Sequence, residues 1–274
     1  GRYPGDGLIN LSKTRDTVGI FAHSVSDIVL LDDVLSGGSK PAKANIKELR
    51  LAVPRDPFYK ALENETAEVI ENVLVLLEKS GATLVEIDMK ALFPLTEKIS
   101  LPVAIYETLR ELADYLQTNS LNITLEQLIA EIVSPDVKHI MEAAQADQKI
   151  SEEVYLEALN VHRPQLLQIF ADYFMNNNIN AMLYPTTALT ARPIGEDETV
   201  EINGQQLSTF SSYIRNGDPS SCADIPSLSI PAGLTTAGLP VGLSIDGPVN
   251  QDDEILAIGA AIAAILPPLE GPKL

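Results

Sequence analysis

The chain has 274 residues, a formal net charge of −19 and a hydrophobic content of 45%. At this length one large α/β domain or two small ones can form, with about 70–75% of the unfolded surface buried. The acidic balance argues against a nucleic-acid or anionic-membrane partner, because phosphate binding needs clustered lysines and arginines. The single cysteine excludes an internal disulfide and a multi-cysteine zinc site and favours the reducing cytoplasm. No apolar run approaches the ~20 residues of a membrane-spanning helix.

The N-terminal residues predict a loop, a helix and a strand. Residues 1–19 combine glycines with turn-forming residues and are expected to form a loop beside a sheet. Ser24 predicts a helix N-cap, with Asp27 at the third helical position and Gly37 at the end. The predicted buried face of this helix consists of Val25, Ile28, Leu31 and Leu35. Residues 49–53 then alternate in character and predict a strand.

The next segment completes a predicted β-α-β unit. Apolar residues at helical spacing predict one long helix from Phe58 to Leu77, which ends at Gly81. Residues 85–89 alternate between apolar and acidic side chains and predict a second strand. A crossover of this kind joins parallel strands, so we expect a sheet whose faces are covered by helices.

A helical segment follows at about 101–178. Thr124, Ser134 and Ser151 predict three helix starts within it, and a proline follows Ser134 at the first helical position. Pro164 lies inside the last predicted helix and should kink or split it, because proline lacks the N–H that the helical ladder needs. A helical insertion of this kind often forms a cap over a site.

The C-terminal part predicts strands joined by one long loop. Residues 181–184 form a short apolar run that predicts a buried strand, and Asn203–Gly204 in the loop that follows predicts a hairpin turn. Two further apolar runs, 227–230 and 241–245, are bounded by glycines and prolines and predict neighbouring buried strands. Asn250 is the expected N-cap of a final helix.

The histidines give no clear catalytic or metal site. His139 and His162 lie on predicted helices without a cysteine or aspartate cluster at metal spacing, so a structural role is favoured. A triad of Ser12, His23 and Asp16 has the right residue types, but nothing in the sequence brings the three together, and a structural role at the helix start is favoured for His23.

The polar loop around Cys222 is the other candidate for nucleophilic chemistry. Ser220, Ser221 and Cys222 directly precede a predicted buried strand, where active-site loops often lie. A nucleophile needs an activating base and oxyanion donors, and no base can be named for Cys222. A small buried cysteine is therefore the favoured interpretation. The sequence contains no phosphate-binding loop, dinucleotide fingerprint or His-Glu-x-x-His motif.

Two segments resemble the amidase signature family. Residues 1–37, GRYPGDGLINLSKTRDTVGIFAHSVSDIVLLDDVLSG, are similar to the segment that follows the catalytic serine in that family. Residues 184–248, which begin YPTTALTARPIG and end IPAGLTTAGLPVGLSIDGP, are similar to its C-terminal part, most closely in the indoleacetamide and mandelamide hydrolase branch. The helical segment at 101–178 resembles the variable cap region only in kind.

The resemblance implies a fold and a reaction. The fold class is α/β, a three-layer α/β/α sandwich on a mixed sheet, with residues 1–274 as the C-terminal portion of a single amidase domain and the helical insertion at about 101–178. The family hydrolyses a carboxamide to carboxylate and ammonia with a serine nucleophile, a second serine and a lysine base. Serine is a poor nucleophile until its proton is taken, and lysine can take it only if burial keeps the amine neutral.

The same resemblance implies that the three catalytic residues precede this chain, so no catalytic residue is expected in it and the chain alone should be inactive. The substrate-binding residues that it implies are Tyr184, Thr186, Thr187, Tyr213, Asp218 and Cys222. No cofactor and no metal are expected. The expected partners are a small-molecule amide, arylacetamide-like in chemistry, and a complementing fragment or a second copy of the chain, without nucleic acid or membrane.

Four positions depart from the family pattern. Ile20, His23, Cys222 and Asp224 stand where family members usually have proline, arginine, asparagine and glycine. Losing the glycine at Asp224 can crowd a close approach of the backbone, and losing the arginine and asparagine removes hydrogen bonds. Two alternatives follow: a non-catalytic interaction protein that keeps the fold, and a self-contained hydrolase that uses Cys222 or Ser221.

Overall fold

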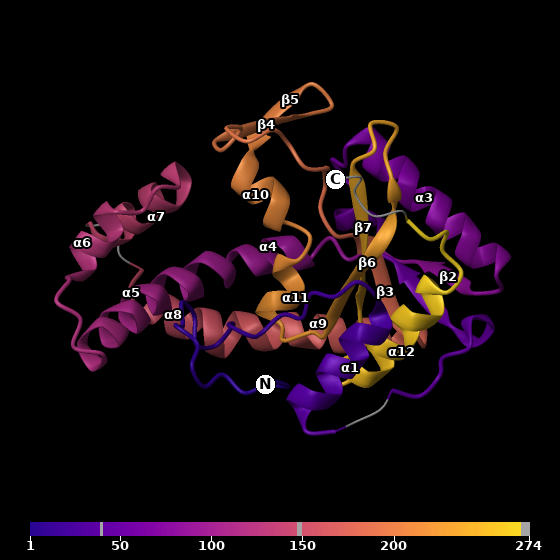
Figure 1. Cartoon of the computed structure of the whole chain (residues 1–274), viewed down its shortest axis with the longest axis horizontal. Coiled ribbons are helices and arrows are strands. Elements are labelled where there is room, and N and C mark those ends of the chain that lie inside the picture. Colours follow the sequence, from indigo (N-terminus) through magenta and orange to yellow (C-terminus); the bar gives the residue numbers. More distant parts are fainter. Residues whose placement is uncertain (39–40, 147–149, 270–274) are drawn as a thin grey trace.

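The computed structural model describes residues 1–38, 41–146 and 150–269. At its centre is a five-stranded sheet in the order β2-β1-β3-β7-β6 (Figure 1). The strands are β1 (Arg50–Val53), β2 (Thr83–Glu86), β3 (Ala181–Pro185), β6 (Ser227–Leu234) and β7 (Pro240–Asp246). The first three run parallel to one another, whereas β7 is antiparallel to both β3 and β6. The sheet is therefore mixed, as predicted.

Helices cover both faces of this sheet. One face packs against α3 (Asn64–Lys79) and α12 (Asp252–Ala263), with α1 (Val25–Ser36) beside α12. The other face packs against α4 (Leu92–Glu97), α5 (Ser100–Thr118), α9 (Arg163–Asn177) and α11 (Asp218–Cys222). Neighbouring strand residues point to opposite faces, so Leu51 and Leu183 belong to the first core, and Ala52 and Met182 belong to the second. The result is the expected three-layer α/β/α sandwich.

The first helix begins and ends where the sequence predicts, but its buried face differs. The Ser24 side chain accepts a hydrogen bond from the Asp27 amide, and Gly37 ends α1 with a φ of 83°. Leu31 and Leu35, predicted to be buried, are both 42% exposed. Val25 is buried and Ile28 packs against the core, as predicted, but the other buried residue of the helix is a charged one, Asp32. The prediction was therefore wrong for Leu31 and Leu35, because an aspartate that pairs with a distant arginine has no signal in an apolar periodicity.

The predicted long helix is two separate helices. The short helix α2 (Arg55–Phe58) is followed by a turn in which Ala61 has a φ of 51°, and α3 begins only at Asn64. Phe58 packs against Tyr184 in the core opposite to α3, with ring centroids 4.4 Å apart. Its helical spacing from the α3 residues is therefore a coincidence of the sequence.

The second strand lies earlier in the chain than predicted. The alternating pattern covers residues 85–89, but β2 begins at Thr83 and ends at Glu86. The Met89 amide donates to the Asp56 carbonyl oxygen at 2.8 Å, so the chain has already turned toward α2 at this point. A 3₁₀ turn, Ile46–Glu48, precedes β1 in the chain.

The helical segment has the starts that the sequence predicts. After α5 come α6 (Leu125–Ala130), α7 (Pro135–Gln145), α8 (Glu152–Glu157), a π-helical turn (Ala158–His162) and α9. The side chains of Thr124 and Ser151 accept N-cap hydrogen bonds, whereas Ser134 occupies its N-cap position without one. The π-helical turn lies directly before Pro164, so the last helix is divided as predicted. Figure 1 shows α6 and α7 at the end of the molecule away from the sheet.

The C-terminal part confirms the predicted hairpin and strand pair. The strands β4 (Thr199–Ile202) and β5 (Gln205–Ser208) join at Asn203 and Gly204, both with positive φ, and α10 (Thr209–Ile214) follows. The strand β6 extends past its predicted end to Leu234, with an irregularity between Pro231 and Gly233. It tolerates a proline because it is the edge strand of the sheet. The N-cap of α12 is Gln251, and the predicted cap, Asn250, is in the left-handed region instead.

One buried carboxylate fixes the N-terminal loop to the helical segment. Glu107 on α5 accepts hydrogen bonds from the Ser12 hydroxyl at 2.7 Å and from the Thr14 amide and hydroxyl at 3.1 and 3.0 Å. Its other oxygen accepts from the Tyr155 hydroxyl of α8 at 2.8 Å. Residues 1–24 form no helix or strand, so these side-chain bonds replace the backbone ladder that would otherwise hold them.

We expect Glu107→Ala to lower the free energy of unfolding by about 2–4 kcal/mol, because it leaves the buried Ser12 hydroxyl without an acceptor and releases two segments. Tyr155→Phe removes a single donor and should cost about 1 kcal/mol. Urea unfolding followed by circular dichroism measures both losses. Equal stability of the alanine variant and the unmodified chain would contradict this role of Glu107.

Candidate functional site

The candidate site lies where one face of the sheet changes from apolar to polar. The face that packs on α9 is apolar at β1 and β3, but at β7 and β6 it carries hydroxyl groups. The Thr186 and Ser229 hydroxyls are 2.7 Å apart, and the Ser244 hydroxyl donates to Thr186 at 3.0 Å. The outward residues of β6, Ser227, Ser229 and Pro231, are exposed. This hydroxyl floor, defined as Thr186, Ser229 and Ser244, reaches solvent at Ser229, whereas Thr186 is half-buried and Ser244 is buried.

A buried network lies beside the hydroxyl floor. The fully buried carboxylate of Asp246, at the end of β7, accepts hydrogen bonds from the Tyr184 hydroxyl at 2.7 Å and from the Ser220 hydroxyl. Burial raises the pKa of Asp246 to about 6, and the hydrogen bonds only partly oppose this shift. Tyr184 is itself fully buried. It therefore supports the site from behind and has no surface that faces a ligand.

The short helix α11 carries a second polar cluster. Arg15, from the N-terminal loop, donates to the Asp218 carboxylate at 2.7 Å and to the Ser221 hydroxyl at 3.0 Å. The Ser100 hydroxyl, at the start of α5, donates to the same Asp218 oxygen at 2.9 Å. Three segments that are far apart in the sequence thus meet at α11.

A hollow of about 800 Å³ lies between α11 and the N-terminal loop. Its wall includes Arg15, Asp16, Ser220 and Ser221, and it extends to Ser227 at the start of β6. These side chains supply hydrogen-bond donors and acceptors of both charges within one concave surface. Such a surface can bind a small polar group such as an amide.

Two predicted substrate residues contact the loop after β3: Thr187 lies in it, and Tyr213 lies on α10. The Thr187 hydroxyl donates to the Leu189 carbonyl oxygen and the Tyr213 hydroxyl donates to the Thr190 carbonyl oxygen, both at 2.7 Å. The first bond lies within the loop, and the second joins the loop to α10 rather than to α11. Of the six predicted residues, the structure joins Tyr184 to α11 through Asp246 and places Asp218 and Cys222 together, whereas Thr187 and Tyr213 belong to a neighbouring cluster.

Cys222 has the environment of a structural residue. It is 1% exposed, and the polar group within hydrogen-bond reach of its sulfur is the Asp218 carboxylate, at 3.8 Å. Burial raises the pKa of the thiol to about 12. A thiol that stays protonated near neutral pH is a poor nucleophile, so the site gives no support to a cysteine hydrolase.

The triad of Ser12, His23 and Asp16 does not assemble either. The Ser12 hydroxyl donates to Glu107, and the Asp16 carboxylate accepts from the Leu11 and Ser12 amides at 2.6 and 3.0 Å. His23 is exposed. Among the residues that the structure describes, no group of three or more histidine, cysteine, aspartate or glutamate side chains can hold a metal ion.

We expect the Cys222 thiol to react with a disulfide reagent such as 5,5′-dithiobis(2-nitrobenzoate) about a hundredfold more slowly in the native chain than in urea at pH 8. The reason is that burial both shields the sulfur and keeps it protonated. Release of the coloured thiolate measures the rate, and Cys222→Ser gives the background. A native rate equal to the unfolded rate would show a reactive thiol and revive the cysteine hydrolase.

The loop after α11 is held in a left-handed conformation. Asp224 has a φ of 50°, which explains why a glycine suits this position. Arg163, at the start of α9, pairs with the Asp224 carboxylate and donates to the Cys222 carbonyl oxygen at 3.1 Å. Asp224 therefore has a sterically unfavourable backbone conformation, and its side chain forms an ion pair with the helical segment.

Two substitutions separate these contributions. Asp224→Ala loses the ion pair and keeps a side chain at positive φ, whereas Asp224→Gly loses the ion pair and removes the steric cost. We expect the glycine variant to be more stable than the alanine variant by about 1 kcal/mol. The ion pair is half-exposed and contributes less than about 1 kcal/mol, so the glycine variant should remain close to the unmodified chain. Thermal unfolding compares the two variants and the unmodified chain. If the glycine variant is no more stable than the alanine variant, the backbone at this position is not strained.

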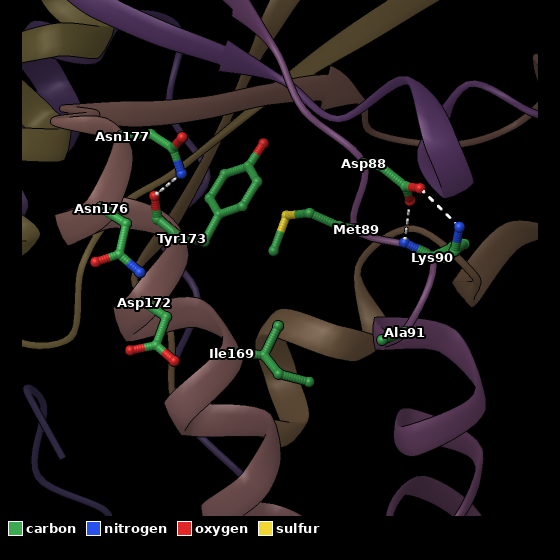
Figure 2. A pocket seen from close by; sticks show the side chains of 9 residues that line it. All are labelled: Asp88, Met89, Lys90, Ala91, Ile169, Asp172, Tyr173, Asn176 and Asn177. Atoms are coloured by element: carbon green, nitrogen blue, oxygen red, sulfur yellow. Dashed lines mark hydrogen bonds and ion pairs between the residues drawn. The ribbon is translucent and has the colours of Figure 1, made fainter.

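A second pocket, of about 420 Å³, lies between α9 and the loop after β2 (Figure 2). It is lined by Met89, Tyr173 and several polar residues, and the Asp88–Lys90 ion pair stands at its rim. The Tyr173 hydroxyl is buried with no partner among the described residues. No base and nucleophile meet here, so the pocket offers no catalytic arrangement.

The sequence named Ser220 but missed the residues that give it a role. Asp246, Arg15, Arg163 and Ser229 carry no motif of their own. A signal was available for Asp246, because a lone acidic residue that ends an apolar strand and precedes a glycine must find buried partners or leave the core. Arg15 has no local signal, since its partner is more than 200 residues away.

Comparison with known proteins relates this geometry to one family. The family model described as Amidase matches residues 1–256. The chain is 40% identical over 262 residues to an indoleacetamide hydrolase of Allorhizobium ampelinum, which covers 96% of this chain and 57% of that protein. It is 34% identical over 278 residues to a mandelamide hydrolase of Pseudomonas putida, which covers 97% of this chain and 53% of that protein.

The fold agrees with solved structures. A crystal structure of an amidase matches with a TM-score of 0.81 and 25% identity, covering 97% of this chain and 57% of the other. The chain thus spans little more than half the length of the relatives that it matches. Within the described residues, no helix has the length and apolar character that crossing a membrane requires.

Proposed function

The chain belongs to the amidase signature family, and on that premise we propose that it is the C-terminal part of an amide hydrolase. The proposed reaction converts a carboxamide, of the arylacetamide kind, to carboxylate and ammonia in the cytoplasm. The similarity to indoleacetamide and mandelamide hydrolases over nearly the whole chain supports this substrate class. Residues 1–274 are then one portion of a single amidase domain, with the helical segment at about 101–178 as its insertion.

The observation that carries the proposal is the edge of the sheet at β6, next to the hydroxyl floor. Among the described residues, β6 pairs with β7 on one side only, and its outward serines are exposed. Phe21 is 98% exposed, and Leu30 and Val34 of α1 are also exposed. An unpaired sheet edge and exposed apolar residues elsewhere on the surface both favour completion by further protein, either a complementing portion of an amidase or a second copy of the chain.

We propose distinct roles for the six predicted substrate residues. Thr186, on the hydroxyl floor, contacts the amide, and Thr187 and Tyr213 shape the neighbouring loop. Asp218 orients Arg15 at the wall of the hollow. Tyr184 and Cys222 are buried, and they support the wall without touching the substrate. The lysine base and the two serines of the reaction come from the portion that this chain does not match.

A non-catalytic interaction protein remains the second candidate. Asp224 at a positive φ and Cys222 in a buried position are the observations that favour it, because both replace residues that the family pattern prefers. It requires the same fold but predicts no turnover in any combination of portions.

The test is a fusion of this chain to the N-terminal part of the Allorhizobium ampelinum indoleacetamide hydrolase that the chain does not match. We expect ammonia release from indoleacetamide or mandelamide by the fusion to exceed that of the chain alone by about a thousandfold or more, because the chain alone lacks an activated nucleophile. Replacing the nucleophilic serine of the added portion by alanine gives the background rate.

Matched variants assign the activity to this chain. Thr186→Val in the fusion should lower kcat/KM about tenfold, which is the effect of losing one hydrogen bond to the substrate. Thr199→Val, on the exposed hairpin, makes the same chemical change outside the site and should have no effect. Turnover by the chain alone would overturn the need for completion, and a folded but inactive fusion would favour the interaction protein.

A further inference from the structure

Asp246 is a buried carboxylate that forms no ion pair with the described residues. It is fully buried at the end of β7, and one of its oxygens accepts from both Tyr184 and Ser220. Its other oxygen has no hydrogen-bond partner among the described residues. A buried carboxylate in this state is costly, so its position needs a reason beyond packing.

The groups that face Asp246 are hydroxyls from three different elements. Tyr184 lies on β3, Ser220 on α11, and Ser227 is its register partner on β6. Burial and the neighbouring carboxylate raise the pKa of Tyr184 well above its ordinary value, so this group stays neutral between pH 4 and 7. The acidic residue of α11, Asp218, forms an ion pair with Arg15. Between Tyr184 and Asp246, the group that changes charge in that range is therefore Asp246.

Ser220 gives Asp246 a connection to the candidate site. Within α11, Ser220 is flanked by Pro219 and Ser221, and the Ser221 hydroxyl accepts from Arg15 at the wall of the hollow. The Ser220–Asp246 hydrogen bond joins α11 to the sheet. A change in the charge of Asp246 can therefore affect the wall of the hollow through the Ser220 hydroxyl.

We infer that Asp246 is a positioning residue of the candidate site, which through Ser220 sets the place of α11 beside the hollow. The consequence for catalysis rests on the proposed function, but the consequence for α11 does not. Asp246 touches neither the hollow nor a reacting atom. Its influence on a substrate is therefore indirect and depends on its charge.

The direction of the pH effect follows from the two states of α11. In the closed state the pKa of Asp246 is raised from 3.8 to about 6 by burial. In an opened state, where water reaches the carboxylate, the pKa returns to its ordinary value. The closed state therefore binds the proton more tightly and is favoured at low pH. Opening of α11 should increase as the pH rises from about 4 to about 6 and then level off.

Hydrogen exchange of the chain itself tests this inference. After correction for the intrinsic pH dependence of chemical exchange, the amides of residues 218–222 should open up to about a hundredfold more at pH 7 than at pH 4. Asp246→Asn should abolish that pH dependence, and Ser220→Ala should raise opening already at pH 4. Tyr173→Phe removes a buried hydroxyl outside the network and should match the unmodified chain, as should the hairpin amides of 199–208 in every variant.

Kinetics of the active fusion give the second readout. Asp246→Asn should remove the inflection near pH 6 from the pH profile of KM, whereas kcat should change less than about twofold, since the residue does not touch the reacting atoms. An unchanged pH profile in Asp246→Asn, or a pH dependence of exchange at 218–222 that survives this variant, overturns the inference. If the fusion is inactive, the proposed function fails, and the exchange experiment still decides the role of Asp246.

Discussion

Buried carboxylates hold together the parts of this molecule that the sheet does not reach. Glu107 fixes the N-terminal loop to α5 and α8, and Asp246 connects β3, β7 and α11. Asp32 of α1 plays the same part, because it is buried and accepts from Arg2 at 2.5 and 2.6 Å and from Tyr3 at 2.7 Å. The hydrogen bonds from Arg2 lower the pKa of Asp32, opposite to the shift at Asp246. The difference is that Asp32 pairs with a cation, Arg2. Asp32 therefore keeps its charge, whereas the charge of Asp246 can change with pH.

Local features of the chain could be predicted from the sequence. Ser24, Thr124 and Ser151 act as N-caps, and Asn203–Gly204 forms a hairpin turn, because each depends on bonds within a few residues. The break before α3 and the exposed side of α1 could not be predicted in the same way. Both depend on what lies across the core, such as the contact of Phe58 with Tyr184, and periodicity along one helix contains no such information.

The candidate site could also be predicted only in part from the sequence. The segment around α11 could be located from its polar residues before a buried strand, and the similarity to amidases gave the residue set. Which of those residues face a ligand could not be predicted. Tyr184 and Cys222 are as polar in sequence as Thr186, but burial separates them, and Arg15 reaches Asp218 only because the N-terminal loop returns to the sheet.

Pro231 has a consequence for any strand that joins the sheet beyond β6. Proline has no N–H, so an incoming strand finds a missing donor at this point, and the irregularity between Pro231 and Gly233 bends the edge just after it. A continuous ladder can form along Ser227–Ile230 and must stop there. A strand shifted by one residue would also exchange the sides of its own inward and outward side chains. Pro231 therefore restricts the register in which another strand can pair with β6 and limits non-specific pairing along this edge.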